Sequence, residues 1–459
     1  MEEQAINLKP IARELGIDLD RVSKTVELLD AGNTVPFITR YRREVTGGLD
    51  EQQIEAVRAQ VQRRRQLDER RGAILRSLEG QNKLTDELRS QLQSAKSVQQ
   101  LEDLYLPYKP KRQSLAEKAR EQGLAPLAEE ILSESKSCEN LDQRAADFIN
   151  EDKGVKDAAT ALVGAGHILA ERFSESPELR SAARKIVRDT GCLVSKRVEG
   201  LSEKRAAVFK DFLDYREKLS RVPTHRTLAI NRGEREKALN VSVECDADAV
   251  HAAAIELFVP PAHQHQDLLT GCLRDSVQRL LLPSLYREAR RKLSDKAEDH
   301  SLSVFARNLR RLLLQPPLPG KRVLALDPGY KNGCKLAALD EHGRLLAHDL
   351  IHLVGNEEKQ AEGRKRLAEL ITEHSIALIA IGNGRACRPS EQLVAELLSD
   401  ELKEHDAHYV VVNEAGASVY STSSIGREEL PDLDATHRSA VSIGRRLQDP
   451  LSELVKIDP

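Results

Sequence analysis

The sequence changes from helical to strand-like periodicity within residues 321–352, and this change separates two kinds of structure. Residues 323–326 form a short apolar run that ends in Asp327, and a Pro-Gly pair typical of a turn follows at once. Two more strand-like runs occupy residues 333–339 and 344–353. Because turn-forming residues separate the runs, they predict a three-stranded antiparallel meander whose first strand ends in a carboxylate.

Helical and strand-like segments alternate after this meander. Apolar residues recur at helical spacing in residues 358–373, 389–402 and 434–447, whereas continuous apolar runs occupy residues 376–381 and 409–412. Three antiparallel strands followed by two helix-strand units predict a mixed five-stranded sheet with helices on its faces. This is the element order of an RNase H-like domain.

The N-terminal part of the chain has helical periodicity. Residues 6–15 and 18–29 predict two helices that meet at Gly16, with the spacing of a helix-turn-helix. The second helix carries acids as well as bases, so we interpret the turn as a joint between core helices rather than a DNA-reading element. Asp50 and Gln53 form the pattern of a capping box at the start of a long, highly charged helix.

The middle of the chain continues this helical pattern. Residues 114–308 predict a string of moderate helices, with one strand pair at residues 226–231 and 238–245. A proline-rich linker at residues 315–320 leads into the sheet domain. The predicted fold is therefore a multi-helical N-terminal region followed by an α/β domain.

Composition limits the classes of function. Charged residues make up 31% of the chain at a net charge of −3, and this balance is compatible with nucleic-acid binding if the basic residues cluster. Aromatic residues make up 3% with no Trp, which weakens any model based mainly on base stacking. The six cysteines form no CxxC pair, which is typical of reduced thiols. With neither a signal peptide nor a membrane-length apolar run, we expect a cytoplasmic protein without a membrane partner.

Two segments present basic residues beside aromatic ones. The first contains Arg40, Arg42 and Arg43 between a proline and a Gly-Gly pair, so we expect a loop that contacts phosphates. Pairing of these arginines with helix carboxylates is the alternative. The second segment ends in Lys109, Lys111 and Arg112 around two prolines, which suits a groove that follows a nucleic-acid backbone. A packed Pro-Tyr-Pro corner would explain its tyrosines equally well.

The ends of the predicted strands carry two acids, Asp327 and Glu414. Nucleases with an RNase H-like fold use carboxylates to hold two Mg²⁺ ions about 3.5–4 Å apart. A third and a fourth carboxylate are missing here, because Asn383 follows the fourth strand and the last helix offers Arg438 instead of an acid. We therefore expect no metal cofactor, with Mg²⁺ required only if the chain is a nuclease.

Structural roles explain the same residues without catalysis. Asp327 would cap the turn that follows it, and Glu414 would pair with a nearby arginine. Gly382-Asn383-Gly384 could cradle a phosphate, but it lacks the Lys-Ser/Thr of a P-loop. A tight strand-to-helix turn is the preferred interpretation of this glycine motif.

Seven longer segments resemble the landmarks of the Tex family of bacterial transcription accessory proteins, and they occur in that family's order along almost the whole chain. They are TVPFITRYRREVTGGLD, LEDLYLPYKPKR, VLALDPGYKNG, IGNG, VVNEAGASVYS, PDLD and RRLQDPLSELVKIDP. The resemblance implies a helical N-terminal region with a helix-turn-helix-like part, followed by a YqgF domain of RNase H-like fold. It also implies a role in transcription through RNA or DNA binding, in a protein similar to a eukaryotic elongation factor that contacts RNA polymerase.

The resemblance also implies a division of the chain. Tex proteins continue past the position of Pro459 into helix-hairpin-helix modules and a C-terminal OB-fold RNA-binding domain, so we expect a truncated member or a fragment. The expected parts are a helical region with the helix-turn-helix-like part at 1–190, a further helical scaffold and linker at 191–319, the YqgF domain at 320–450, and the start of a helix-hairpin-helix region at 451–459.

Two hypotheses about function follow. In the first, the chain is a non-catalytic scaffold that contacts RNA or DNA, with RNA polymerase or a ribonucleoprotein as a further partner. In the second, it is a metal-dependent nuclease of the RNase H or resolvase type that uses Asp327 and Glu414. The oligomeric state is left open by the sequence.

Overall fold

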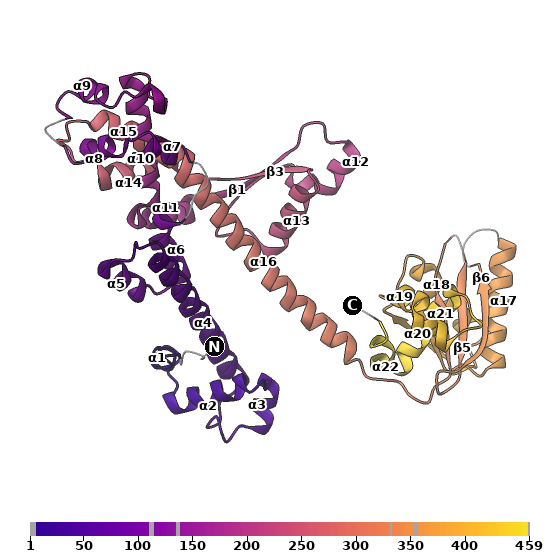
Figure 1. Ribbon diagram of the computed structural model, residues 1–459. Helices are drawn as coiled ribbons and strands as arrows, with labels where there is room; N and C mark the ends of the chain where they lie inside the picture. Colours follow the sequence, from indigo (N-terminus) through magenta and orange to yellow (C-terminus); the bar gives the residue numbers. More distant parts are fainter. Residues whose placement is uncertain (1–5, 110–113, 135–137, 331–332, 353–356, 458–459) are drawn as a thin grey trace. The chain divides into compact units, whose positions relative to one another are not determined.

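A computed structural model describes residues 6–109, 114–134, 138–330, 333–352 and 357–457 (Figure 1). The chain divides into two compact units, Met1–Glu298 and Asp299–Pro459, which are described separately below.

The first unit is mainly helical, as the sequence predicts. Its α-helices are α1 (Lys9–Leu15), α2 (Leu19–Asp30), α3 (Val35–Tyr41), α4 (Glu51–Gly80), α5 (Asp86–Ser94), α6 (Val98–Tyr105), α7 (Leu115–Glu121), α8 (Ala125–Leu132), α9 (Leu141–Ala146), α10 (Ala158–Glu175), α11 (Pro177–Thr190), α12 (Glu203–Ala206), α13 (Thr224–Arg235), α14 (Ala247–Phe258), α15 (Gln266–Asp275) and the first part of α16 (Leu282–Leu313).

Helix α4 joins two small hydrophobic cores. Its predicted capping box is confirmed, since the Asp50 carboxylate accepts from the Gln53 N–H (2.8 Å) and the Gln53 side chain accepts from the Asp50 N–H (3.0 Å). Ile54, Val57 and Val61 pack with α1 to α3, and residues 67–78 of the same helix pack with α5 and α6. The charged middle of α4 therefore lies between the two cores.

A three-stranded antiparallel sheet lies within the first unit, in the order β2 (Asp214–Lys218), β1 (Cys192–Arg197), β3 (Leu239–Glu244). The predicted strand at 238–245 is confirmed as β3, but the predicted strand at 226–231 is wrong, because those residues lie in α13. Thr227, Ile230 and Gly233 are buried at helical spacing, and this period outweighed the short β-branched pattern.

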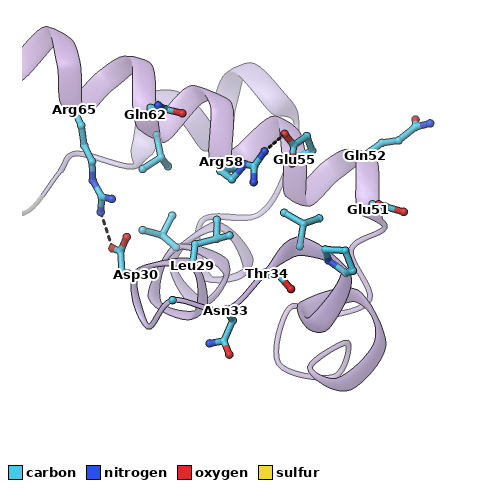
Figure 2. A pocket seen from close by; sticks show the side chains of 15 residues that line it. Leu29, Asp30, Asn33, Thr34, Glu51, Gln52, Glu55, Arg58, Gln62 and Arg65 are labelled. Atoms are coloured by element: carbon cyan, nitrogen blue, oxygen red, sulfur yellow. Dashed lines mark hydrogen bonds and ion pairs between the residues drawn. The ribbon is translucent and has the colours of Figure 1, made fainter. Parts of the chain in front are cut away.

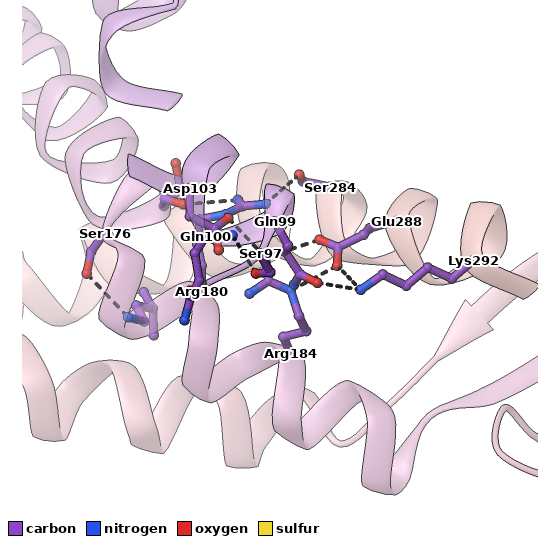
Figure 3. A network of polar contacts seen from close by, with 12 residues as sticks. Ser97, Gln99, Gln100, Asp103, Ser176, Arg180, Arg184, Ser284, Glu288 and Lys292 are labelled. Atoms are coloured by element: carbon purple, nitrogen blue, oxygen red, sulfur yellow. Dashed lines mark hydrogen bonds and ion pairs between the residues drawn. The ribbon is translucent and has the colours of Figure 1, made fainter. Parts of the chain in front are cut away.

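A buried carboxylate, Asp103 of α6, connects α6 with α11 (Figure 3). It accepts from Arg180 Nε and from Arg184 Nη2, both at 3.0 Å, and Asp103 and Arg180 are each less than a tenth exposed. Arg184 continues the network to Glu288 of α16 (2.9 Å), which also accepts from Lys292 (2.8 Å). A buried charge is tolerated only when it is paired in this way, so the network determines how the three helices meet.

The second unit contains the predicted mixed five-stranded sheet, which is confirmed in the order β6-β5-β4-β7-β8. Its strands are β4 (Val323–Asp327), β5 (Cys334–Leu339), β6 (Leu345–Ile351), β7 (Leu378–Gly382) and β8 (His408–Val412). Strands β4, β5 and β6 form the antiparallel meander, and β4, β7 and β8 run parallel.

Helices cover both faces of this sheet. Helices α17 (Glu357–Glu373) and α18 (Cys387–Ser399) pack on the face that contains Leu324 and Leu326. Helix α21 (Ala435–Gln448) packs on the opposite face, which contains Val323 and Ala325. Three short helices complete this unit: α19 (Ala417–Thr422), α20 (Ser424–Glu429) and α22 (Pro450–Leu454).

We predict that Asp103→Asn destabilises the first unit by about 3 kcal/mol, because Arg180 would remain buried without its counter-charge. Differential scanning calorimetry should show the corresponding fall in the melting temperature of that unit. Asp20→Asn is the matched control, since the Lys24–Asp20 pair is exposed to solvent and should contribute little to stability. Equal melting temperatures for Asp103→Asn and the unmodified chain would contradict this role for Asp103.

Candidate functional site

Three parallel strands bring polar residues to one edge of the sheet in the second unit. Asp327 ends β4, Asn383 follows β7 and Glu414 follows β8. Because the carboxyl ends of parallel strands meet at the same edge, these side chains converge there. The charge of Asp327 acts on the Glu414 carboxyl, so the two acids that the sequence places at strand ends lie close enough to interact.

The glycine motif Gly382-Asn383-Gly384 contacts the Glu414 carboxylate, which takes the place that a phosphate would have in a phosphate-binding loop. The Gly384 N–H donates to the Glu414 carboxylate, and Asn383 Oδ1 accepts from the Glu414 N–H (3.1 Å). A Cβ on Gly384 would lie 2.3 Å from Glu414 Oε1, and a Cβ on Gly382 would lie 2.6 Å from Oε2. Both glycines are therefore required by the close approach of the carboxylate, in agreement with the preferred interpretation as a tight turn.

Burial and charge both act on Glu414. Burial of this carboxyl raises its pKa above the ordinary glutamate value, and the nearby charge of Asp327 raises it further. Among the described residues, Glu414 forms no ion pair with an arginine and the Asp327 carboxylate accepts no hydrogen bond. The expected arginine pair and turn cap are thus not found in this part of the chain.

Two cations that the sequence interpretation missed lie near these acids. Lys335 is the cross-strand partner of Asp327 in the β4–β5 pair. Arg446 of α21 is buried and donates through Nη1 to the backbone oxygens of Asn413 (2.8 Å) and Ala415 (2.7 Å), which flank Glu414. Burial lowers the pKa of Arg446, and the charges of Glu453 and Glu414 oppose this shift.

Arg438, the cation that the last helix offers in place of an acid, forms no ion pair with Asp327 or Glu414 among the described residues. Its guanidinium donates instead to the backbone oxygens of Leu430 (3.0 Å) and Ser421 (3.3 Å). The sequence shows that both Arg438 and Arg446 belong to the last helix. It does not show which of them lies on the helix face that is turned toward the two acids.

The residues at this edge do not match the ligand set of a two-metal nuclease. Such sites bind divalent ions with several oxygen ligands, whereas Asp327 and Glu414 are joined here by the amide of Asn383 and by the cations Lys335 and Arg446. Within the described ranges, no group of three or more His, Cys, Asp or Glu residues is arranged to hold a metal ion.

A basic and aromatic cluster, made of Phe37, Arg40, Tyr41, Arg42 and Arg43, lies at the end of α3. The Phe37 and Tyr41 rings are 5.3 Å apart, Arg42 lies over the Phe37 ring, and Tyr41 is 60% exposed. All three arginines are exposed, and none forms an ion pair with a residue that the structure describes. The alternative of helix carboxylate partners is therefore unsupported within those residues.

The prediction that a loop presents all three arginines is wrong for Arg40, which lies in the last turn of α3. Pro36 stands in the first turn of that helix, where proline is tolerated, so it does not break the helix. Arg42 and Arg43 do lie in the following turn. Arg21 donates to the backbone oxygens of Thr46 (3.1 Å) and Gly47 (2.6 Å), which fixes this turn.

The second predicted basic segment is described only in part. Lys109 is exposed, adopts an extended backbone conformation after the 3₁₀ turn η1 (Leu106–Tyr108), and forms no ion pair with the described residues. Lys111 and Arg112 lie outside the described residues.

A cavity of about 870 Å³ lies between α2, the start of α3 and α4 (Figure 2). Its two arginines are already neutralised, because Arg65 pairs with Asp30 (2.6 Å) and Arg58 pairs with Glu55. The arginines of this cavity are thus paired with carboxylates, whereas those at the end of α3 have no carboxylate partner among the described residues.

No α-helix in the described part of the chain combines the length and the apolar character needed to cross a lipid bilayer.

We predict that Gly384→Ala destabilises the second unit by about 1–3 kcal/mol, because the new methyl group would displace the Glu414 carboxylate. Calorimetry of Gly384→Ala, Glu414→Ala and the double variant forms a double-mutant cycle, in which removal of Glu414 should cancel most of the cost. Gly271→Ala is the control, since a Cβ there meets no atom within 4 Å. Strictly additive effects would show that Glu414 and Gly384 do not interact.

Comparisons with known proteins agree with this architecture. The Tex-like protein N-terminal domain matches residues 6–79, the Tex central region-like family matches residues 137–305, and the Tex protein YqgF-like domain matches residues 321–448. The chain is 41% identical over 455 residues to the transcriptional accessory protein Tex of Neisseria gonorrhoeae, which covers 98% of this chain and 59% of that protein.

Two further relatives show the same pattern of coverage. Protein tex of Bordetella pertussis is 42% identical over 463 residues, covering 98% of this chain and 58% of its own length. The human S1 RNA-binding domain-containing protein 1 is 33% identical over 452 residues, covering 95% of this chain and 44% of its own length. The chain therefore spans between 44% and 59% of the length of these relatives, and the three family matches follow one another along it. It belongs to the Tex family.

Proposed function

We propose that the chain is a non-catalytic nucleic-acid-binding scaffold in transcription. The observation that carries this proposal is the cluster of Arg40, Arg42 and Arg43, whose exposed charges lack carboxylate partners among the described residues. Guanidinium groups bind phosphate oxygens in bidentate geometry, so unbalanced arginines on one surface are suited to a phosphate backbone. The names of the gonococcal and human relatives, which refer to transcription and to RNA binding, support the same role.

The aromatic pair adds a second contact to this surface. Tyr41 is exposed and lies against Phe37, so its outer face is free to stack on an unpaired base. A base can reach such a face only when it is not stacked within a duplex. The cluster therefore fits a single strand better than a double helix.

In this proposal, the second unit has an RNase H-like sheet without the carboxylates that a nuclease needs. The RNase H-like sheet brings Asp327 and Glu414 together, but Lys335 and Arg446 occupy the surroundings where further acids would be needed. We propose that this domain acts as a binding or spacing element and that its acids have structural roles. RNA polymerase or a ribonucleoprotein is the further partner that we propose.

We predict that replacing Arg40, Arg42 and Arg43 together by Ala weakens binding to a labelled single-stranded RNA. Each phosphate contact to a single strand contributes about 0.7 to the magnitude of the slope of log K against log salt. If each arginine contacts one phosphate, the loss of all three should therefore reduce that magnitude by about 2. Fluorescence anisotropy at several salt concentrations measures both quantities.

The control removes three exposed arginines that do have carboxylate partners, Arg89, Arg172 and Arg216. It alters the same number of positive charges but should leave the salt slope nearly unchanged. Equal loss of binding in both triple variants would argue against a specific contact by the arginine cluster.

We predict that the purified chain cleaves neither single-stranded RNA nor branched DNA in the presence of Mg²⁺ or Mn²⁺, because two carboxylates beside two cations are a poor site for paired metal ions. Gel electrophoresis of labelled substrates after prolonged incubation is the measurement. Cleavage that is lost in Asp327→Asn would instead establish the nuclease hypothesis.

A further inference from the structure

A second cavity lies in the first unit, where α6, α11 and α16 meet, and it has a volume of about 1330 Å³. This volume is above the roughly 300–1,000 Å³ of typical small-molecule sites, so a nucleotide fits within it. Neither the arginine cluster nor the acids of the sheet domain contribute to its lining. The cavity is therefore a separate feature from the surface proposed above.

Two of the three acids that line this cavity are neutralised by their neighbours. Asp103 accepts from Arg184, and Glu288 accepts from both Arg184 and Lys292 (Figure 3). Burial disfavours the charge on Glu288, but the hydrogen bonds from Arg184 and Lys292 outweigh it and lower the pKa of this carboxyl. The third lining acid, Glu178, is exposed and accepts from the uncharged Ser176 hydroxyl (2.7 Å), so it keeps its negative charge.

The cavity retains three cations after this neutralisation. Lys96, Lys185 and Lys296 are exposed residues of its lining, and none forms an ion pair with a described residue. They come from three separate segments, the loop before α6, α11 and α16, so the lining lysines do not belong to one helix face. Arg188 adds a fourth positive charge, balanced only by its exposed neighbour Asp189.

The polar groups of the wall are also mainly donors. Gln99 Oε1 accepts from Lys292 Nζ (2.7 Å), and Gln100 Oε1 accepts from the Lys96 N–H (2.7 Å). Each amide oxygen thus already accepts one hydrogen bond, and each amide also carries an NH₂ donor. A lining of ammonium and amide donors requires a ligand rich in acceptors and negative charge.

An apolar wall completes the cavity. Leu104, Leu219, Leu285 and Leu293 contribute aliphatic side chains beside the donors. An inorganic anion would leave this wall uncovered, whereas the base and sugar of a nucleotide would pack against it. Shape and chemistry together point to a ligand that is anionic at one end and flat and apolar at the other.

We propose that this cavity binds a nucleotide, with Lys96, Lys185 and Lys296 as its phosphate contacts and the leucine wall against its base. The nucleotide can be free in solution or one unit of a nucleic-acid strand, because both present the same phosphate, sugar and base. The site does not depend on the arginine cluster at α3.

The test compares the whole chain with the triple variant Lys96→Ala/Lys185→Ala/Lys296→Ala. The matched control, Lys83→Ala/Lys204→Ala/Lys403→Ala, removes three exposed lysines outside the cavity. ATP and GTP are titrated by isothermal calorimetry, and a labelled single-stranded RNA is titrated by anisotropy in the Arg40→Ala/Arg42→Ala/Arg43→Ala background. That background removes the other proposed contact, so failure of one site does not hide the other.

We expect the cavity variant to lose about tenfold or more in affinity, as the removal of several phosphate contacts requires, and the control to stay within about twofold. A loss of affinity for ATP or GTP would identify the ligand as a free nucleotide. A loss of affinity for RNA alone would identify it as one nucleotide of a strand. Either result supports the proposed site. Photo-crosslinking with an azido-nucleotide, or with thiouridine in the RNA, should label residues 177–188 or 285–296. The absence of any binding by the whole chain, equal affinities in both variants, or labels only elsewhere would overturn the proposal.

Discussion

The first unit depends on a carboxylate that water barely reaches. Asp103 lies in α6 and accepts from two arginines of α11, and one of these reaches Glu288 of α16. Removing such charges from water is unfavourable unless each is paired with good geometry, so only one arrangement of the three helices satisfies all of them. The same pairing neutralises Asp103 and Glu288, whereas Lys96, Lys185 and Lys296 of the adjacent cavity have no ion pair with a described residue.

The second unit has the sheet of an RNase H-like domain, but its strand ends carry fewer carboxylates than a nuclease uses. Parallel pairing of β4, β7 and β8 brings their carboxyl ends to one edge, and this geometry alone places Asp327 near Glu414. A nuclease would need further carboxylates there. Instead the chain holds Glu414 against two glycines and fixes its flanking backbone with Arg446, so the acid contacts the turn that leads from β7 into α18.

The candidate binding residues share exposed positive charge that no described carboxylate balances. Most of the arginines on the long helices have carboxylate partners, as Arg58 and Arg65 do in the cavity beside α3. Exposed pairs of this kind contribute little to stability, but the carboxylate cancels the positive electrostatic potential that would attract a phosphate. Two groups of cations keep a positive potential, because no described carboxylate forms an ion pair with them. They are Arg40, Arg42 and Arg43, and separately Lys96, Lys185 and Lys296.

The mixed sheet, the helical first unit and the capping box at Asp50 could be predicted from hydrophobic periodicity and turn residues, which are local properties of the chain. The same local patterns placed Asp327 and Glu414 at strand ends. The folded chain was needed to show that Arg446 binds the backbone beside Glu414, which arginines remain unpaired, and that Asp103 is the buried centre of a network. These depend on contacts between residues far apart in the chain, and a helix of given periodicity does not specify which of its polar side chains a distant strand or helix will meet. Even residues 226–231 became helical because burial of Thr227, Ile230 and Gly233 against their neighbours outweighed the local preference for a strand.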